Sequence, residues 1–286
     1  DVSLEQVETV PVGETVLDLA TPAPSKKTDA GAPKTAKERS IPLLIGAACV
    51  YMALAALVVR VLLAFTVEGY GVDMGCFGAW AGKMADGGPA NFYEEGYFCD
   101  YPPAYMLVLW LLGLLGRALG LGTGSMAFQG LMKLVPIACD LALAAVCFKW
   151  AEKKLGEGAA LAVAALLALN PAFIVTSSCW GQIDSVLALL LVLMLLYARA
   201  GRWAIAIPIF ALAVLAKPQA GLLAPLGVAA LMKEARLGER RGKSVGLGLL
   251  GGVAATLIVV LPFAWGENIF TWLVDKYAAT LSGYPH

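Results

Sequence analysis

Several stretches of this chain hold about 20 mostly apolar residues in a row, the length that an α-helix needs to cross the ~30 Å hydrocarbon core of a bilayer. They cover residues 41–66, 127–149, 158–178, 181–199 and 244–266, and a longer run, 202–233, is interrupted by a Lys-Pro-Gln triplet. Of the 286 residues, 59% are hydrophobic and only 15% are charged, which is outside the usual range of soluble domains. The sequence therefore predicts an all-α integral membrane protein.

The basic residues orient these spans, because loops rich in lysine and arginine stay on the cytoplasmic side. Four basic segments precede or separate the apolar runs, at residues 26–39, 149–158, 198–202 and 233–243. All four reach one side only if the shorter apolar run 103–119 does not cross and the Lys-Pro-Gln triplet is an external turn between two short spans. We therefore expect a seven-span module over 41–266, with the N-terminus inside and a long external loop at 67–126.

The two ends of the chain carry different expectations. Residues 1–40 lack an apolar pattern and are rich in small polar residues, proline and lysine, so we expect a disordered cytoplasmic tail. Residues 267–286 indicate the start of a further extracytoplasmic loop, and we expect the chain to be a piece of a longer protein. The only histidine is His286, which excludes histidine-based triads and zinc motifs within this chain. Zero formal net charge without a long basic aromatic stretch argues against nucleic-acid binding.

The external loop 67–126 is acidic and begins with a predicted interfacial helix. Its apolar residues follow helical spacing, at Phe77, Trp80, Ala81 and Met84. A glycine-proline segment from Gly87 then ends the helix. This pattern brings Asp73 and Asp100 back to the same membrane surface.

Each of these two carboxylates has a structural and a functional interpretation. Asp73 could cap the interfacial helix, and Asp100 could lie in a turn before Pro102 and Pro103, whose fixed φ excludes helix just ahead of the apolar run. Two carboxylates beside an interfacial cleft are also candidates for a general base and a substrate-positioning group.

Polar residues follow two later spans on the same side. Gln182 and Asp184 could cap the next helix, with Asp184 favoured by the helix dipole, and Trp180 could belong to an aromatic belt. Lys217 could snorkel from a span end. Its place beside Pro218 and Gln219, at an external break, also suggests an anion site.

Charged residues also occur inside the apolar runs. Arg60 lies near the outer end of the first run and could bind a phosphate or snorkel. Lys133 and Asp140, seven positions apart on one helix face, could form a buried ion pair.

In the external loop, Cys76 and Cys99 bracket the acidic segment and predict a disulfide, since extracytoplasmic loops meet an oxidising environment.

Six ordered segments over about residues 60–286 resemble the GT-C superfamily of membrane glycosyltransferases. Within it they are similar to the bacterial mannosyltransferases related to the second mannosyltransferase of GPI-anchor assembly, and more distantly to the dolichyl-phosphate-glucose glucosyltransferases of N-glycan assembly. The segments are GYGVDMGCFGAWA, GPANFY, CDYPPAYMLVLW, LMKLVPIACDLALA, LNPAFIVTSSCWGQIDS and AVLAKPQAGLLAPL.

The resemblance implies a seven-span GT-C-like module with interfacial helices in its first external loop. It also implies transfer of a hexose from a polyprenyl-phosphate donor to a lipid, glycan or protein acceptor, with inversion. In the mannosyltransferases that the segments resemble, the hexose is mannose. The reaction takes place on the extracytoplasmic face of the cell membrane. The catalytic aspartate of the family falls on Asp73, and the acidic residue of its second motif falls on Asp100, followed by Tyr101.

A phosphate leaving group needs cationic or hydrogen-bond stabilisation, for which Lys217, Gln219 and Arg60 are candidates, with Trp180, Gln182 and Asp184 as further substrate contacts. Asp73 and Asp100 could also ligate a divalent metal, although the sequence has no dense ligand cluster. The main alternative is a transporter or lipid flippase with charged residues along a path through the bilayer. A structural or assembly subunit would leave the polar motifs without a task.

Overall fold

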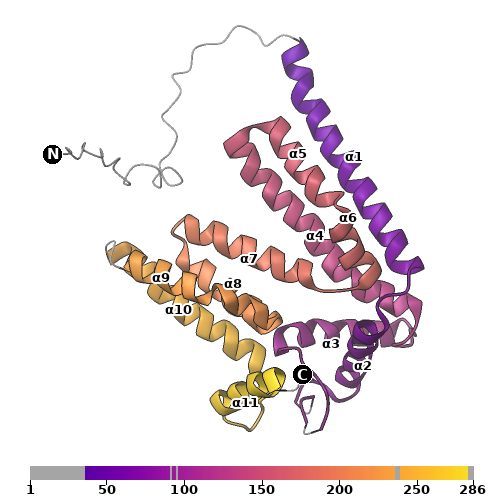
Figure 1. Ribbon diagram of the computed structural model, residues 1–286, viewed down its shortest axis with the longest axis vertical. Helices are drawn as coiled ribbons and strands as arrows, with labels where there is room; N and C mark the ends of the chain where they lie inside the picture. Colours follow the sequence, from indigo (N-terminus) through magenta and orange to yellow (C-terminus); the bar gives the residue numbers. More distant parts are fainter. Residues whose placement is uncertain (1–35, 91, 95, 236–238, 283–286) are drawn as a thin grey trace, which may run out of the picture.

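The computed structural model describes residues 36–90, 92–94, 96–235 and 239–282, and these residues form helices without any β-strand (Figure 1). The helices are α1 (Ala36–Thr66), α2 (Gly71–Gly87), α3 (Pro103–Ala118), α4 (Met126–Leu155), α5 (Glu157–Ala168), α6 (Pro171–Ile174), the π-helical turn η1 (Val175–Trp180), α7 (Asp184–Arg199), α8 (Trp203–Ala216), the 3-10 segment η2 (Pro218–Leu223), α9 (Ala224–Ala235), α10 (Glu239–Val260) and α11 (Ile269–Ser282). The predicted all-α class is confirmed.

Four helical stretches within the described residues are long and apolar enough to cross a membrane. They are Leu44–Thr66, Met126–Leu155, Glu157–Trp180 and Gly242–Val260, and they match four of the predicted runs. Large apolar side chains such as Leu54, Val58 and Leu62 of α1 remain exposed on their outer surfaces, as expected of helices that face lipid. The chain is therefore a membrane protein.

The remaining predicted spans are shorter helices. Helices α7, α8 and α9 have 16, 14 and 12 residues, fewer than the roughly 20 that a full crossing needs. The long run 202–233 divides where the sequence predicts, because Lys217 precedes Pro218 and adopts an extended backbone, with φ −152° and ψ 123°. Leu231 of α9 packs near Trp203 at the start of α8, so the chain turns back on itself between these helices.

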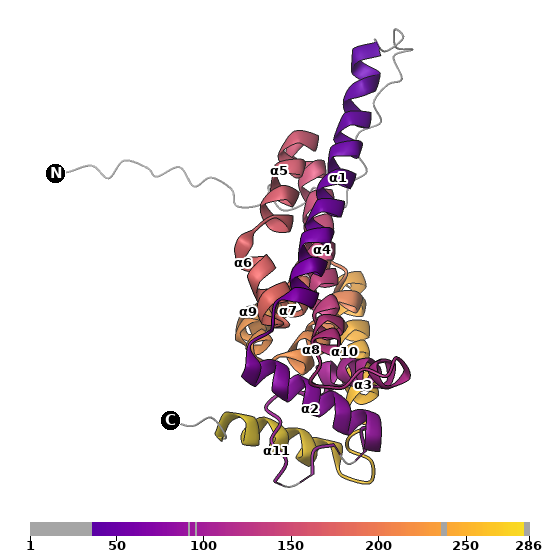
Figure 2. The ribbon, with the colours of Figure 1, turned by 90° about the vertical axis from the view of Figure 1, so that its right-hand side faces the viewer.

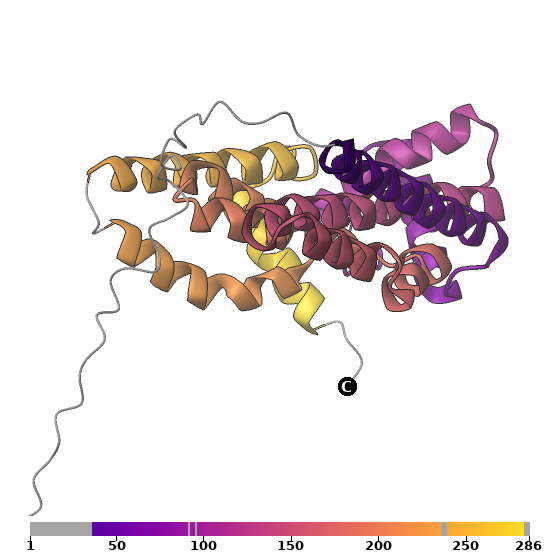
Figure 3. The ribbon, with the colours of Figure 1, turned by 90° about the horizontal axis from the view of Figure 1, so that it is seen from above.

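The helices form an elongated bundle with two sides. Seen from above (Figure 3), the early helices, indigo to magenta, occupy one side and the late helices, orange to yellow, occupy the other. Helix α4 packs against α1 and α5, and α10 packs against α8. Helix α7 contacts both α4 and α8 and joins the two sides.

One end of the bundle is covered by helices that run across it. Figure 2 shows α2 and α11 lying crosswise to α1 at its C-terminal end. Helix α2 contains the predicted apolar face, since Phe77, Trp80, Ala81 and Met84 are all buried, and it ends at Gly88 with φ 70°. Helix α3 packs against α2 and also contacts α4, α8 and α10. It starts at Pro103 after Pro102, in the position that proline favours.

The structure corrects one predicted boundary and adds a helix near the other end of the chain. Helix α1 starts at Ala36, inside the segment 1–40 that the sequence predicts to be disordered, and residues 1–35 of that segment lie outside the described residues. The segment 267–286, predicted to begin an extracytoplasmic loop, contains α11, and its side of the membrane stays a prediction. This helix is anchored by Trp272, which is 4% exposed and packs on Phe263 and Tyr93.

A buried ionic network holds four helices together. Nε of Arg60 on α1 lies 3.5 Å from Oδ2 of Asp140 on α4, and both side chains are inaccessible to solvent. The Arg60 guanidinium also donates to the backbone carbonyl of Ala168 at the end of α5, and Ser185 of α7 donates to the other carboxylate oxygen of Asp140. The pairing offsets much of the cost of two charges inside a membrane, while Nη2 of Arg60 has no hydrogen-bond partner among the described residues.

The network corrects two predictions. Asp140 pairs with Arg60, not with Lys133, because the partner lies across the helix interface and not along α4. Arg60 is buried in the bundle among α1, α4 and α5, so the interpretation of Arg60 as an external substrate-binding residue is wrong.

Candidate functional site

Three polar side chains meet where α2 begins and η1 ends. Oδ2 of Asp73 accepts one hydrogen bond from Nε1 of Trp180 and another from Nε2 of Gln182, both at 2.6 Å. Asp73 lies in the first turn of α2, but the N-cap position belongs to Tyr70, so the capping interpretation of Asp73 is wrong. Both donors bind one carboxylate oxygen, and Oδ1 has no hydrogen-bond donor among the described residues.

The local sequence explains how Trp180 and Gln182 reach Asp73. The π-helical turn η1 ends at Gly181, which adopts φ 93°, and the backbone N–H groups of Gly181 and Gln182 both donate to the carbonyl of Thr176 at 3.0 Å. A side chain at position 181 would meet the Met74 methyl group at 2.5 Å. Glycine is therefore needed here for its backbone conformation and for the close approach of α2.

Helix α4 fixes the segment that connects α1 to α2. Nζ of Lys133 donates to the carbonyls of Val67 at 2.7 Å and Ala64 at 3.4 Å. Oε1 of Gln129, one turn earlier on the same face, accepts the backbone N–H of Gly69 at 3.0 Å. The backbone N–H of Tyr70 donates in turn to the carbonyl of Trp180 at 3.1 Å, so these contacts set the position of Asp73.

Gln182 links the carboxylate to a lysine and a tyrosine. Its Oε1 accepts from the hydroxyl of Tyr101 at 3.2 Å and from Nζ of Lys217 at 3.4 Å. Lys217 also forms an ion pair with Asp184 in the first turn of α7. The side chain of Lys217 is only 13% exposed, whereas that of Asp184 is 55% exposed, so solvent screens this pair in part.

Tyr101 brings the second acidic motif to the same place. Burial raises the pKa of its phenol above the usual range, and the nearby carboxylates of Asp100 and Asp73 raise it further. Tyr101 is therefore neutral and donates a hydrogen bond. Asp100 is half-buried, and its negative charge acts on both Tyr101 and Cys76.

The structure thus gathers six of the predicted site residues into one cluster linked by hydrogen bonds, and it places a seventh, Asp100, beside it. The six are Asp73, Tyr101, Trp180, Gln182, Asp184 and Lys217. Gln219 is exposed on η2, and Arg60 lies in the separate buried network. In the part of the chain that the structure describes, no group of three or more carboxylate, thiol or imidazole side chains could hold a metal ion.

The predicted disulfide between Cys76 and Cys99 is not formed, and both residues are free thiols. The Cys99 sulfur is directed instead toward the carbonyl of Tyr101, at 3.6 Å, and the sulfur of Met106, at 3.8 Å. Burial raises the pKa of the Cys99 thiol to about 12, so this thiol is protonated at neutral pH.

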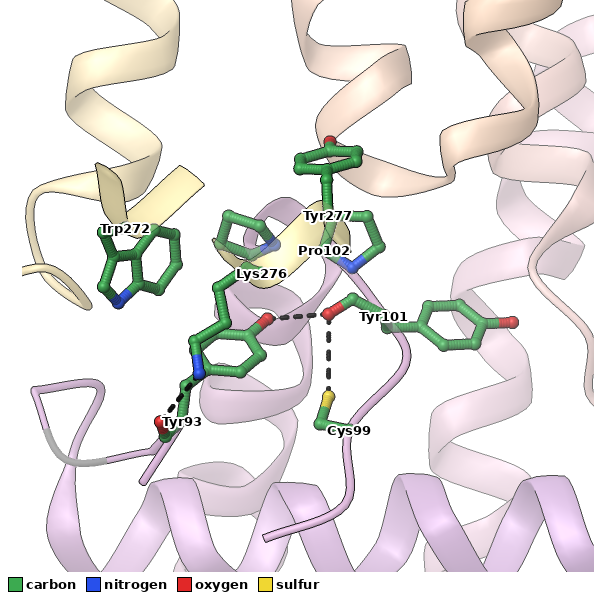
Figure 4. A pocket seen from close by; sticks show the side chains of 8 residues that line it. Tyr93, Cys99, Tyr101, Pro102, Trp272, Lys276 and Tyr277 are labelled. Carbon is green, nitrogen blue, oxygen red and sulfur yellow. Dashed lines mark hydrogen bonds between the residues drawn. The ribbon is translucent and has the colours of Figure 1, made fainter. Parts of the chain in front are cut away.

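Three further residues, which are not among the predicted site residues, support the site. Gln129 stands four positions before Lys133 on an apolar helix, and this spacing places both side chains on one face. That signal could have been found. Tyr93 and Lys276, which line a small pocket behind Tyr101 (Figure 4), carry no comparable pattern.

The arrangement can accept a proton and hold an anion within a short distance. Oδ1 of Asp73 has no bound donor among the described residues, so it can accept a proton from an incoming hydroxyl group. The ammonium of Lys217 and the second N–H of the Gln182 amide can hold an anion beside that carboxylate, whereas the single indole N–H of Trp180 is already bound to Asp73.

The helical fold and the apolar spans define the class as an all-α membrane protein. The chain matches no model of a known protein family, and it matches no curated protein sequence.

Proposed function

We propose that this protein is a GT-C-like membrane glycosyltransferase, which transfers a hexose from a polyprenyl-phosphate donor to an acceptor hydroxyl. The resemblance to mannosyltransferases favours mannose as the hexose. The observation that carries the proposal is the convergence of Asp73, Gln182 and Lys217, which come from three distant parts of the chain. A carboxylate, an amide and an ammonium in contact supply what the reaction needs at its two ends.

In the proposed reaction, Asp73 is the general base. Oδ1 takes the proton of the acceptor hydroxyl while the hydroxyl oxygen attacks the anomeric carbon of the sugar. The hydrogen bonds from Trp180 and Gln182 to Oδ2 hold the carboxylate in place and leave Oδ1 available to the acceptor. A single displacement of this kind inverts the anomeric configuration and needs only one carboxylate.

The leaving group is the polyprenyl phosphate. As the bond between the anomeric carbon and the phosphate oxygen breaks, the electron pair remains on that oxygen and the phosphate gains negative charge. Lys217 is the cation that stabilises this charge, with Asp184 holding its ammonium in the free protein. Because a phosphate leaves readily, no carboxylic acid is required on that side.

The proposed site lies at the extracytoplasmic face of a seven-span module in the cell membrane. The helix ends opposite the cluster carry basic residues, with Lys153 and Lys154 in the last turn of α4, Arg199 in that of α7 and Lys233 in that of α9. Basic loops favour the cytoplasmic side, which puts Asp73 outside. The short helices α7, α8 and α9 would then cross a membrane thinned around the bundle.

The transporter alternative fits the structure less well. It requires charged groups that face a path through the bilayer. Arg60 and Asp140 instead pair with each other, and the fully buried Lys133 donates to two backbone carbonyls. Arg60, Asp140 and Lys133 are thus bound to protein groups, although Nη2 of Arg60 has no hydrogen-bond partner among the described residues.

The proposal is tested by transfer of labelled mannose from polyprenyl-phosphate mannose, catalysed by the full-length protein, with membranes of its source organism as acceptor. We expect Asp73→Asn to abolish transfer and Asp86→Asn to retain it, since Asp86 lies on the same helix but pairs with Arg117 on the surface. Full activity of Asp73→Asn would show that the proposed base is wrong.

A further inference from the structure

A second layer of contacts lies behind Tyr101, in the pocket formed by the loop after α2, the start of α3 and α11. Figure 4 shows the hydroxyl of Tyr93 and the thiol of Cys99 both directed at the backbone carbonyl of Tyr101, while the Tyr101 phenol points to the opposite side. The Tyr93 hydroxyl donates to this carbonyl at 2.8 Å. Tyr101 is therefore held by its backbone on one side and contacts Gln182 on the other.

Tyr93 is in turn fixed by α11. Nζ of Lys276 donates to the backbone carbonyl of Tyr93 at 2.9 Å and lies 5.1 Å from the centre of its ring. The rings of Tyr93 and Trp272 pack edge to face with their centres 5.4 Å apart. These contacts connect a helix near the C-terminal end of the chain to the loop that carries Tyr101.

The contacts continue to the proposed base. The Tyr101 hydroxyl donates to Oε1 of Gln182, and Nε2 of the same amide donates to Asp73. An amide that accepts on its oxygen must present its NH₂ group on the other side. Lys217, which can only donate, and the Asp73 carboxylate, which can only accept, fix this amide orientation. The Tyr101 hydroxyl adds a second donor to the amide oxygen and so holds the Gln182 side chain in place beside Asp73.

We propose that Tyr93 is a positioning residue for the transfer reaction, which acts through Tyr101 and Gln182 on the orientation of Asp73. The inference rests on the proposed function, and it makes α11 part of the site. Tyr93 does not touch the reacting atoms. Its effect should therefore appear in kcat, while KM for the donor, which depends on Lys217, should change little.

The test is a double-mutant cycle in the full-length protein, with Tyr93→Phe, Tyr101→Phe and the combined variant. Tyr277→Phe is a matched control, because Tyr277 lines the same pocket and its hydroxyl donates to the carbonyl of Val214 at 3.0 Å. For each protein we would measure the unfolding temperature in detergent, and kcat and donor KM with polyprenyl-phosphate mannose.

We expect Tyr93→Phe to lower kcat about tenfold, the size of one well-placed hydrogen bond, with donor KM unchanged. Tyr93→Phe and Tyr277→Phe should lower the unfolding temperature by similar amounts, because each removes one hydrogen bond to a backbone carbonyl. Only Tyr277→Phe should keep the native kcat. In the Tyr101→Phe background, Tyr93→Phe should have no further effect, since its route to Asp73 is already broken.

Two results would overturn the inference while the proposed function stands, provided that Asp73→Asn is inactive. One is a combined variant whose loss of kcat equals the product of the two single losses, which would make Tyr93 a purely structural residue. The other is unchanged kcat in Tyr101→Phe. Activity that persists in Asp73→Asn would instead refute the proposed function, and the inference with it.

Discussion

The indole N–H of Trp180 donates to the carboxylate of Asp73 at 2.6 Å, across 107 positions of the sequence. Tyr70 and Trp180 reinforce the same junction with a backbone hydrogen bond and with rings whose centres are 5.3 Å apart. The start of α2 and the end of η1 therefore behave as one unit, and the orientation of Asp73 depends on both.

Removing this donor should weaken the site without unfolding it. Trp180 is 44% exposed, so Trp180→Phe keeps most of the packing and loses the hydrogen bond to a charged group, worth about 1.5 kcal/mol or more. We expect kcat for sugar transfer to fall by about tenfold or more. Trp265→Phe is the control, since the Trp265 side chain is 79% exposed and belongs to none of the hydrogen bonds of the site. Equal activity of the two variants would argue against a role for the indole N–H.

Gly181 should tolerate no side chain. In Gly181→Ala the alanine would have to keep the positive φ of residue 181, and its methyl group would meet the Met74 side chain. The backbone strain alone costs about 1 kcal/mol or more. We expect a lower unfolding temperature and a loss of activity, because the strained backbone at position 181 carries Trp180 and Gln182 and the Met74 side chain must move. Gly75→Ala on α2 is the control, since a Cβ there meets nothing within 4 Å. If both variants behave alike, the close approach of Gly181 and α2 is unimportant.

The buried pair of Arg60 and Asp140 should be needed for stability and not for chemistry. Arg60→Met or Asp140→Leu leaves one charge without its partner inside the bundle, at a cost of about 3–5 kcal/mol. We expect the double variant to be more stable than either single variant, as judged by thermal unfolding in detergent. Single variants that unfold like the native protein would show that the pair contributes little.

The Cys99 thiol should make stability depend on pH in the alkaline range. Its pKa is raised from 9.0 to about 12 in the folded protein, so the unfolded chain releases this proton first as the pH rises. The free energy of unfolding should therefore fall between pH 9 and pH 12, and below pH 9 this thiol should add no pH dependence to it. Cys99→Ala should show a shallower loss over that range when unfolding is followed by intrinsic fluorescence. Parallel curves would contradict the assignment.

Local patterns in the sequence account for much of the fold. The spacing of Phe77, Trp80 and Met84 predicts α2 and its buried face, and the extended backbone at Lys217 follows from the proline after it. The sequence also predicts that Asp73, Gln182 and Lys217 share one side of the membrane, because the basic loops fix the opposite side.

Contacts between helices are harder to predict from the sequence. An apolar run gives the depth of Arg60 in the membrane but not the direction of its side chain, so the sequence could not show that Asp140 is its partner. The same limit hid Tyr93, whose hydrogen bond to Tyr101 depends on how the loop after α2 folds beneath α11. The sequence likewise does not show that Trp272 anchors α11, because this role appears only when Phe263 and Tyr93 are brought beside it.

We propose that the cluster around Asp73 and Lys217 binds the phosphate and sugar of a polyprenyl-phosphate donor. The most direct test is an electron cryo-microscopy structure of the full-length protein with polyprenyl phosphate in a lipid nanodisc. We predict density for the phosphate within hydrogen-bonding distance of Nζ of Lys217, with the lipid chain leaving toward the apolar surface and Asp73 facing the position of the sugar. Phosphate density in a site that contains neither Lys217 nor Asp73 would contradict this mode of donor binding.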